Sequence, residues 1–135
     1  MPTDMKKWIL SSLGFILYLV GATALDAGFE IEKELGSYSV RVKLDRHPPR
    51  LGDNSIEIEL RDRAGKPVTD VKVLVHYYMP PMPRMAPMNY KTEAKLKSIK
   101  YGATMNFVMS GPWVIVIRIT QGEKTWTTKL NVDVP

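Results

Sequence analysis

A period-two alternation of apolar and polar residues recurs along most of this chain, and it constrains the fold more than any other feature. It is clear in residues 38–44 and 56–60, and again near the C-terminus. Successive side chains of a β-strand point to opposite faces, so this pattern predicts half-buried strands rather than helices. In the C-terminal stretch, the predicted inner face carries Trp126, Thr128, Leu130, Val132 and Val134.

Turn signals separate these stretches roughly every 8–12 residues, as in a β-sandwich. They include Pro48 and Pro49, residues 52–54 and 62–67, and a hairpin turn at residues 121–124. The most apolar stretch, residues 113–119, is expected to be a central strand covered on both faces. We therefore predict an all-β, immunoglobulin-like antiparallel β-sandwich of about seven strands over residues 38–135, with a small barrel as the alternative.

The N-terminal segment has the three parts of a secretory signal peptide. Lys6 and Lys7 precede an apolar run over residues 8–20, and a small-residue A-x-A sequence ends at Ala24. Continuing the run to Leu25 brings it close to the length of a spanning helix, so an uncleaved anchor that contacts the membrane through residues 8–20 is the alternative. We thus predict a signal or anchor helix over residues 1–24.

Both alternatives place the rest of the chain outside the cytoplasm, in the periplasm or on the outer face of the cytoplasmic membrane. Residues 25–37 are mostly charged or small, and we interpret them as a linker before the sandwich. The chain contains no cysteine, so this exported domain has neither disulfides nor thiolate ligands.

Several function classes lack support in the composition. The net charge is +5, and the basic residues are scattered among acids without the interleaved aromatic residues typical of nucleic-acid binding. There is no nucleophile elbow, no glycine-rich phosphate loop and no HExxH motif, and the two histidines are far apart in the sequence. We therefore expect neither a nucleic-acid partner nor an enzyme.

Methionine recurs at every third position of a proline-rich segment, residues 79–88. Proline favours polyproline II, which has three residues per turn, so the four thioethers would share one face about 9 Å apart. One ion cannot bind all four while the segment stays straight, but a bend would bring sulfurs together. Thioethers are soft ligands that select Cu(I), or Ag(I), over hard cations. The candidate ligands are Met79, Met82, Met85 and Met88.

Three other residues are candidates to complete such a site. His76 precedes Met79 by three positions, and Met105 and Met109 precede Trp113. Each has a plainer interpretation. Met105 and Met109 share one strand face with Phe107 and are typical of a core. His76 faces away from Val75 and is expected on the outer surface. The Met/Pro segment itself could be an apolar protein-contact surface instead, because methionine adapts to varied partners.

Four segments of the chain resemble the YtkA-like domain, a group of small exported bacterial immunoglobulin-like domains to which FixH-like copper-handling proteins look related. The segments are residues 49–54, residues 62–68, the Tyr-Met-Pro-Pro-Met run at residues 78–82, and residues 101–113 with their Met-Ser-Gly-Pro-Trp run. The resemblance covers residues 38–134. It implies a β-sandwich and a role with copper or another soft metal, with Met79 and Met82 as first candidates and Met85 and Met88 as extensions.

Two functions are therefore expected for this exported domain. The first is Cu(I) or Ag(I) binding, or copper delivery, through the Met/Pro-rich loop. The second is a non-catalytic interaction module that uses the same loop as its contact surface. In either case the expected protein partner is a membrane protein, either an oxidase-assembly factor or an efflux component.

Overall fold

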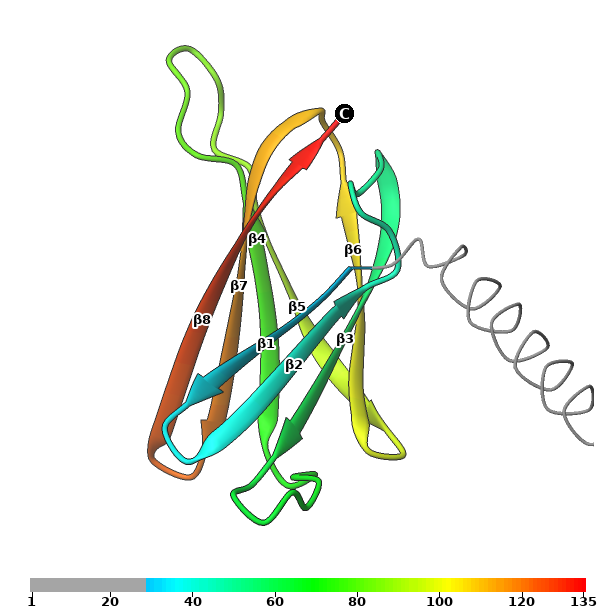
Figure 1. Ribbon diagram of the computed structural model, residues 1–135. Helices are drawn as coiled ribbons and strands as arrows, with labels where there is room; N and C mark the ends of the chain where they lie inside the picture. Colours follow the sequence, from blue (N-terminus) through cyan, green and yellow to red (C-terminus); the bar gives the residue numbers. More distant parts are fainter. Residues whose placement is uncertain (1–28) are drawn as a thin grey trace, which may run out of the picture.

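The computed structural model describes residues 29–135, which form eight antiparallel β-strands. The predicted signal or anchor segment, residues 1–24, lies outside the described residues. Figure 1 shows long strands running between two ends of the molecule. The strands are β1 (Phe29–Leu35), β2 (Tyr38–Leu44), β3 (Gly52–Arg61), β4 (Lys72–Tyr78), β5 (Asn89–Lys97), β6 (Lys100–Phe107), β7 (Gly111–Gln121) and β8 (Lys124–Val134).

The strands follow one continuous order, β1-β2-β3-β6-β5-β4-β7-β8, folded into the two layers of a β-sandwich. Strand β5 joins the layers, because its first part pairs with β4 and its last three residues pair with β6. The two ends of the order approach each other where Lys33 Nζ on β1 donates to the carbonyl oxygen of Lys129 on β8, at 3.0 Å. The predicted all-β sandwich is confirmed.

The core is built from the alternating residues that the sequence pattern selected. Val40, Val42 and Leu44 on β2 are almost fully buried and lie beside Leu60, Ile58 and Ile56 on β3. In the second layer, the inner face of β7 carries the buried residues Trp113, Ile115, Ile117 and Ile119. As predicted, β7 is central, between β4 and β8. The expected cover on both faces is incomplete, because on its outer face Val116 is buried but Arg118 is exposed.

One strand was missed, because β1 lies in the segment that we interpreted as a linker over residues 25–37. Its inward-facing Phe29 and Ile31 pack against the core. Its acidic residues face outward, where Glu30 lies 3.0 Å and Glu32 3.8 Å from the Arg41 guanidinium on β2. The charges that looked like a solvated linker are thus the outer face of an edge strand, which accounts for eight strands rather than seven.

The predicted turn at residues 52–54 was also wrong, since β3 already begins at Gly52. The chain reverses earlier, over residues 45–51. Buried Asn54 organises this connection: its amide nitrogen donates to the carbonyl oxygens of Arg50 and Gly52 at 2.7 and 3.1 Å, and its amide oxygen accepts from the Arg50 N–H at 3.0 Å. Asn54, which the sequence analysis placed in a turn, therefore lies in β3, and its side chain stabilises the preceding turn.

Because every neighbouring pair is antiparallel, the connections divide between two ends of the sandwich. One end, called here the loop end, carries the β2–β3, β4–β5 and β6–β7 connections (Figure 1). Strand β1 begins further down the sandwich, because Phe29 is in register with Ile56 near the middle of β3. The other, called here the far end, carries the β1–β2, β3–β4, β5–β6 and β7–β8 connections. Within residues 29–135, no helix is long and apolar enough to cross a membrane.

Candidate metal centre

The Met/Pro segment is the β4–β5 connection at the loop end, and it is folded rather than straight. The Met79 N–H donates to the Met88 carbonyl oxygen at 3.2 Å, which closes the loop at its base. At its tip, the Met85 N–H donates to the Met82 carbonyl oxygen at 3.3 Å. Arg84 in this turn has φ 67°, the value a type II turn requires after a proline at its first central position. The straight polyproline arrangement was therefore wrong, and the bend that a shared site requires is present.

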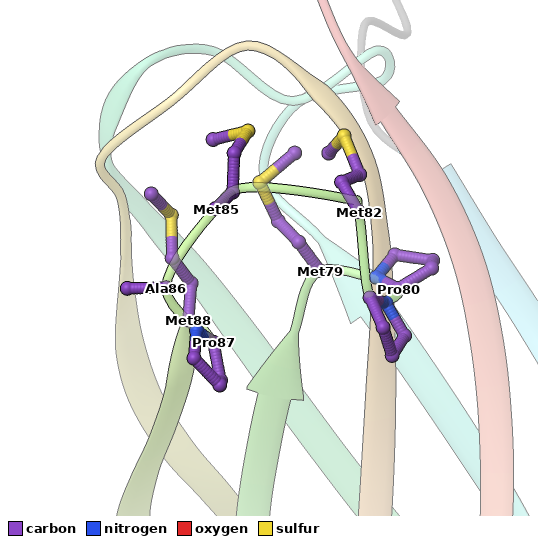
Figure 2. A pocket seen from close by; sticks show the side chains of 8 residues that line it. Met79, Pro80, Met82, Met85, Ala86, Pro87 and Met88 are labelled. Atoms are coloured by element: carbon purple, nitrogen blue, oxygen red, sulfur yellow. The ribbon is translucent and has the colours of Figure 1, made fainter.

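The folded loop brings the four methionine side chains around one hollow of about 80 Å³. Figure 2 shows the Met79 side chain in the middle of the loop, with those of Met82, Met85 and Met88 standing around it. The rest of the lining is proline and alanine: Pro80, Pro81, Ala86 and Pro87. The only side-chain donor atoms on this lining are thus thioether sulfurs.

Exposure increases from the base of the loop to its tip. Met79 is 6% exposed and belongs to the core, Met82 and Met88 are half-buried against it, and Met85 is 38% exposed. The Met79 terminal methyl lies against Gly111, where an added Cβ would be only 2.8 Å from Met79 Cε. The hollow therefore has a fixed thioether at its base and an accessible one at its tip.

Aromatic side chains form a base for the loop, three of them buried in the core and one, Tyr90, exposed. The Tyr77 ring packs on Tyr90, Phe107 and Trp113, with ring centroids 5.4, 5.7 and 6.0 Å apart. The Trp113 indole N–H donates to the Met109 carbonyl oxygen at 2.9 Å, and the Asn106 N–H donates to the Tyr77 hydroxyl at 3.2 Å. Tyr77 and Tyr90 lie in the strands that lead into and out of the loop, so this packing fixes the loop's two ends.

His76 does not join the methionines. It lies on the outer face of β4, opposite buried Val75 and Tyr77, and is absent from the lining of the hollow. Its imidazole pairs with the Asn89 side-chain oxygen and lies beside the Tyr78 ring, with the two ring planes tilted by 39° and their centroids 5.2 Å apart. His76 is therefore a surface histidine, which was the simpler of the two interpretations.

The two remaining candidate methionines are also apart from the hollow. Met105 is fully buried on the inner face of β6 and is a core residue. Met109 follows β6, packs half-buried on the core, and uses its carbonyl oxygen to hold the Trp113 indole. Of the seven candidate ligands, the structure brings together Met79, Met82, Met85 and Met88 and separates His76, Met105 and Met109 from them.

The other common metal-binding side chains do not form a second metal site in the described part of the chain. Among residues 29–135, no three His, Cys, Asp or Glu side chains are grouped closely enough to hold a metal ion. A thioether site needs no such group, because soft ions bind sulfur in preference to carboxylate oxygen.

Comparison with known proteins places the chain in a family. The YtkA-like family matches residues 32–118, which include β2 to β6, the methionine loop and most of β7. The chain belongs to the YtkA-like family. No curated protein is significantly similar to this YtkA-like chain.

Among solved structures, the soluble domain of PmoD from Methylocystis sp. ATCC 49242 (Rockwell) is similar to this YtkA-like domain. The TM-score is 0.53 at 12% sequence identity, over 78% of this chain and 97% of the PmoD domain. At this identity the likeness concerns the fold alone. The resemblance expected from the sequence is confirmed at the level of family and fold.

Sequence reasoning missed Gly111 as a neighbour of the site. The available signal was the glycine within the Met-Ser-Gly-Pro-Trp run, which marks a position where the backbone takes a special conformation or is approached closely. Both apply, since Gly111 has φ 129° and touches Met79 Cε. The run and the methionine loop, distant in sequence, are therefore one structural unit.

Proposed function

We propose that this YtkA-like domain binds Cu(I) or Ag(I) in the loop formed by residues 79–88 and carries the ion to or from a partner. The observation that supports this most directly is that four methionine side chains line one small hollow whose other lining residues are proline and alanine. Met79, Met82, Met85 and Met88 are the proposed ligands, and the ion is cargo rather than a resident cofactor.

The chemistry of the lining fits a soft monovalent ion. Thioether sulfur is uncharged, so it binds Cu(I) or Ag(I) without needing to be deprotonated, unlike a thiol. Carboxylates and imidazoles, which hard and borderline divalent ions prefer, are absent from the lining. The graded exposure supports transfer, because Met85 at the tip is accessible to an incoming ligand while Met79 at the base is held in the core.

The same proposal includes a non-catalytic, exported role. The signal or anchor segment at residues 1–24 would deliver the domain outside the cytoplasm, in the periplasm or at the outer face of the membrane. Methionine suits that setting, since it resists oxidation better than thiolate, although it can still form the sulfoxide. The proposed protein partner is a membrane protein of an oxidase-assembly or efflux system.

Ag(I) titration of the purified domain, followed by thermal unfolding, tests the proposal. An ion that binds only the folded state, at about 100 times its Kd, stabilises that state by about 2.7 kcal/mol. For a domain of this size, we expect the melting temperature to rise by about 10 °C. Cu(I) under reducing conditions should give the same result.

The decisive variant replaces Met79, Met82, Met85 and Met88 with leucine. Leucine keeps the apolar volume but has no sulfur, so the fold should survive while the ion-induced shift disappears. A quadruple variant that still shows the full shift would refute the ligand assignment. If the native domain shows no shift, and replacing the loop with Gly/Ser residues removes a co-purifying protein, the loop is a protein-contact surface instead.

A further inference from the structure

The four methionines of the loop differ in how far solvent reaches them, and Met85 is the most accessible. Met85 is 38% exposed, whereas Met82 and Met88 are half-buried and Met79 belongs to the core. Figure 2 shows the Met85 side chain rising from the crest of the loop. The hydrogen bond from the Met85 N–H to the Met82 carbonyl oxygen fixes the turn at this point. A small solute in the surrounding water therefore meets the Met85 thioether before the other three.

Thioethers are the only sulfur groups that this chain offers to an oxidant, because it contains no cysteine. A reactive thiolate, which would otherwise intercept the oxidant, is thus missing. Of the methionines on β6 and just after it, Met105 is fully buried and Met109 is half-buried against the core. Within residues 29–135, Met85 is therefore the one methionine whose side chain is exposed.

Hydrogen peroxide oxidises a thioether by transferring one oxygen atom to it. The sulfur lone pair attacks one peroxide oxygen, so an S–O bond forms while the O–O bond breaks. The departing hydroxide takes up the proton that the transferred oxygen loses. Sulfur gives up two electrons, peroxide gains them, and the products are methionine sulfoxide and water. Since susceptibility follows exposure, Met85 is expected to react first.

The lone pair that attacks peroxide is the same one that would bind a soft ion. Cu(I) and Ag(I) select soft sulfur donors, and the sulfoxide presents a hard oxygen in place of the free lone pair. Oxidation at Met85 therefore removes the accessible ligand at the tip of the loop, while Met79 at the base keeps its thioether. Conversely, an ion bound to Met85 occupies the lone pair and blocks the oxidation.

The tip of the loop also tolerates the product, since Met85 is exposed and water can solvate the sulfoxide oxygen. The base of the loop does not. A sulfoxide at Met79 would place a polar oxygen in the core, where the end of this side chain already lies against Gly111. Burying a polar group without a hydrogen-bond partner is costly. The folded domain is therefore compatible with oxidation at Met85 and opposes it at Met79.

We propose that Met85 is an oxidation site, at which hydrogen peroxide forms the sulfoxide and thereby switches off soft-ion binding by the empty loop. The selective oxidation is independent of metal, whereas its effect on ion binding rests on the proposed function. An ion already bound in the loop protects the thioether, so the oxidant acts on the empty domain and spares the loaded one.

Peptide mass spectrometry of the full chain, treated with hydrogen peroxide in detergent and digested with trypsin, measures the order of oxidation. Cleavage after Arg84 separates Met79 and Met82 from Met85 and Met88, and fragment masses distinguish the two members of each pair. We expect Met85 to be oxidised about tenfold faster than Met79, because exposure governs the reaction. Saturation with Ag(I) should remove most of this difference by protecting Met85.

Calorimetry with Ag(I) measures the effect of the oxidation on binding. Peroxide treatment that oxidises Met85 alone should weaken Ag(I) binding about tenfold, equivalent to about 1.4 kcal/mol, to the affinity of untreated Met85→Leu. The same treatment should leave the affinity of Met85→Leu unchanged, because its exposed thioether is gone. Met105→Leu keeps Met85 and is the matched control, so it should lose affinity on treatment as the native chain does.

Two further measurements separate loss of the ligand from damage to the fold. The melting temperature of the ion-free protein should change little when Met85 is oxidised, because the sulfoxide lies in solvent. Methionine sulfoxide reductases A and B, each specific for one epimer, should together restore the native affinity. They do so by oxidising a dithiol to a disulfide while the sulfoxide oxygen leaves as water.

Three results would overturn the proposal in different ways. Equal oxidation rates for the four loop methionines would show that the fold does not single out Met85. Native Ag(I) affinity after complete oxidation of Met85 would show that its thioether is not needed, while the proposed ion site itself survives. If the untreated native chain binds no Ag(I), the proposed function fails together with the effect on binding, and the peptide masses alone decide the order of oxidation.

Discussion

The terminal methyl of Met79 packs against the backbone of Gly111, at a position where no other residue would leave it room. An added Cβ would lie 2.8 Å from Met79 Cε, and the glycine has φ 129°. Real Cβ atoms essentially never lie this close to another heavy atom, so a larger residue at position 111 requires the end of the Met79 side chain to shift. This pair links the methionine loop to the β6–β7 connection, and it orients the thioether at the base of the proposed ion site.

Gly111→Ala tests that link. We expect a loss of roughly 1–3 kcal/mol in the free energy of unfolding, because alanine must adopt a strained φ. We also expect weaker Ag(I) binding, because Met79 must move. Urea unfolding measures the first effect, and isothermal titration calorimetry with Ag(I) measures the second.

Gly52→Ala is the matched control for this substitution. Gly52 also has a positive φ, 90°, but nothing lies within 4 Å of its added Cβ. It should lose similar stability and keep native Ag(I) affinity. Native affinity in Gly111→Ala as well would show that the contact does not position the ligand.

Substitutions of Met105 test whether a methionine outside the loop contributes to ion binding. Met105 is fully buried in β6, so Met105→Ala should cost about 2–5 kcal/mol of stability, and Met105→Leu less than about 1.5 kcal/mol. Neither should change Ag(I) affinity, whereas Met79→Leu should lower it at a similarly small cost in stability. If calorimetry on folded Met105→Leu shows weaker Ag(I) binding, Met105 on β6 is part of the ion site after all.

His76 provides the corresponding test on the outer face of β4. Its imidazole pairs with Asn89 across the strand pair, away from the hollow. We expect His76→Ala to leave Ag(I) affinity unchanged and to shift stability by at most about 1 kcal/mol, the value of one exposed hydrogen bond. Asn89→Ala should have the same small effect on stability. A tenfold weaker affinity in His76→Ala alone would make the histidine a ligand.

Strand β1 is expected to be needed for a stable domain. A chain that begins at residue 38, the boundary suggested by the alternation pattern, leaves the edge of β2 unpaired and removes Phe29 and Ile31 from the core. Exposed edges of this kind favour aggregation. We expect a lower melting temperature and a concentration-dependent loss of monomer by light scattering, compared with a chain that begins at residue 29.

The ion pairs of β1 are a useful control for that truncation. Glu30→Gln and Glu32→Gln remove the pairing with Arg41 but keep the strand. Because these groups are about half exposed, each substitution should cost at most about 1 kcal/mol. If the truncated chain is no less stable than these variants, β1 is dispensable.

The sequence by itself determined the fold class and most of the strands. Alternation in residues such as Val40, Val42 and Leu44 is a local property of a strand with one buried face, so it is readable without knowing the neighbouring strands. It failed at β1, where acidic residues on the outer face obscured the inward Phe29 and Ile31, and at residues 52–54, where turn-forming residues begin a strand.

The sequence also singled out the residues of the candidate site but not their arrangement. Methionine at every third position was visible, as was the softness of its sulfur as a ligand. Only the tertiary structure decided that the segment bends, because the closing hydrogen bond between Met79 and Met88 depends on the pairing of β4 with β5. It also decided that His76 and Met105 lie elsewhere and that Gly111 packs on Met79. Such contacts join residues far apart in the chain, and they form only when the two layers close around the shared core.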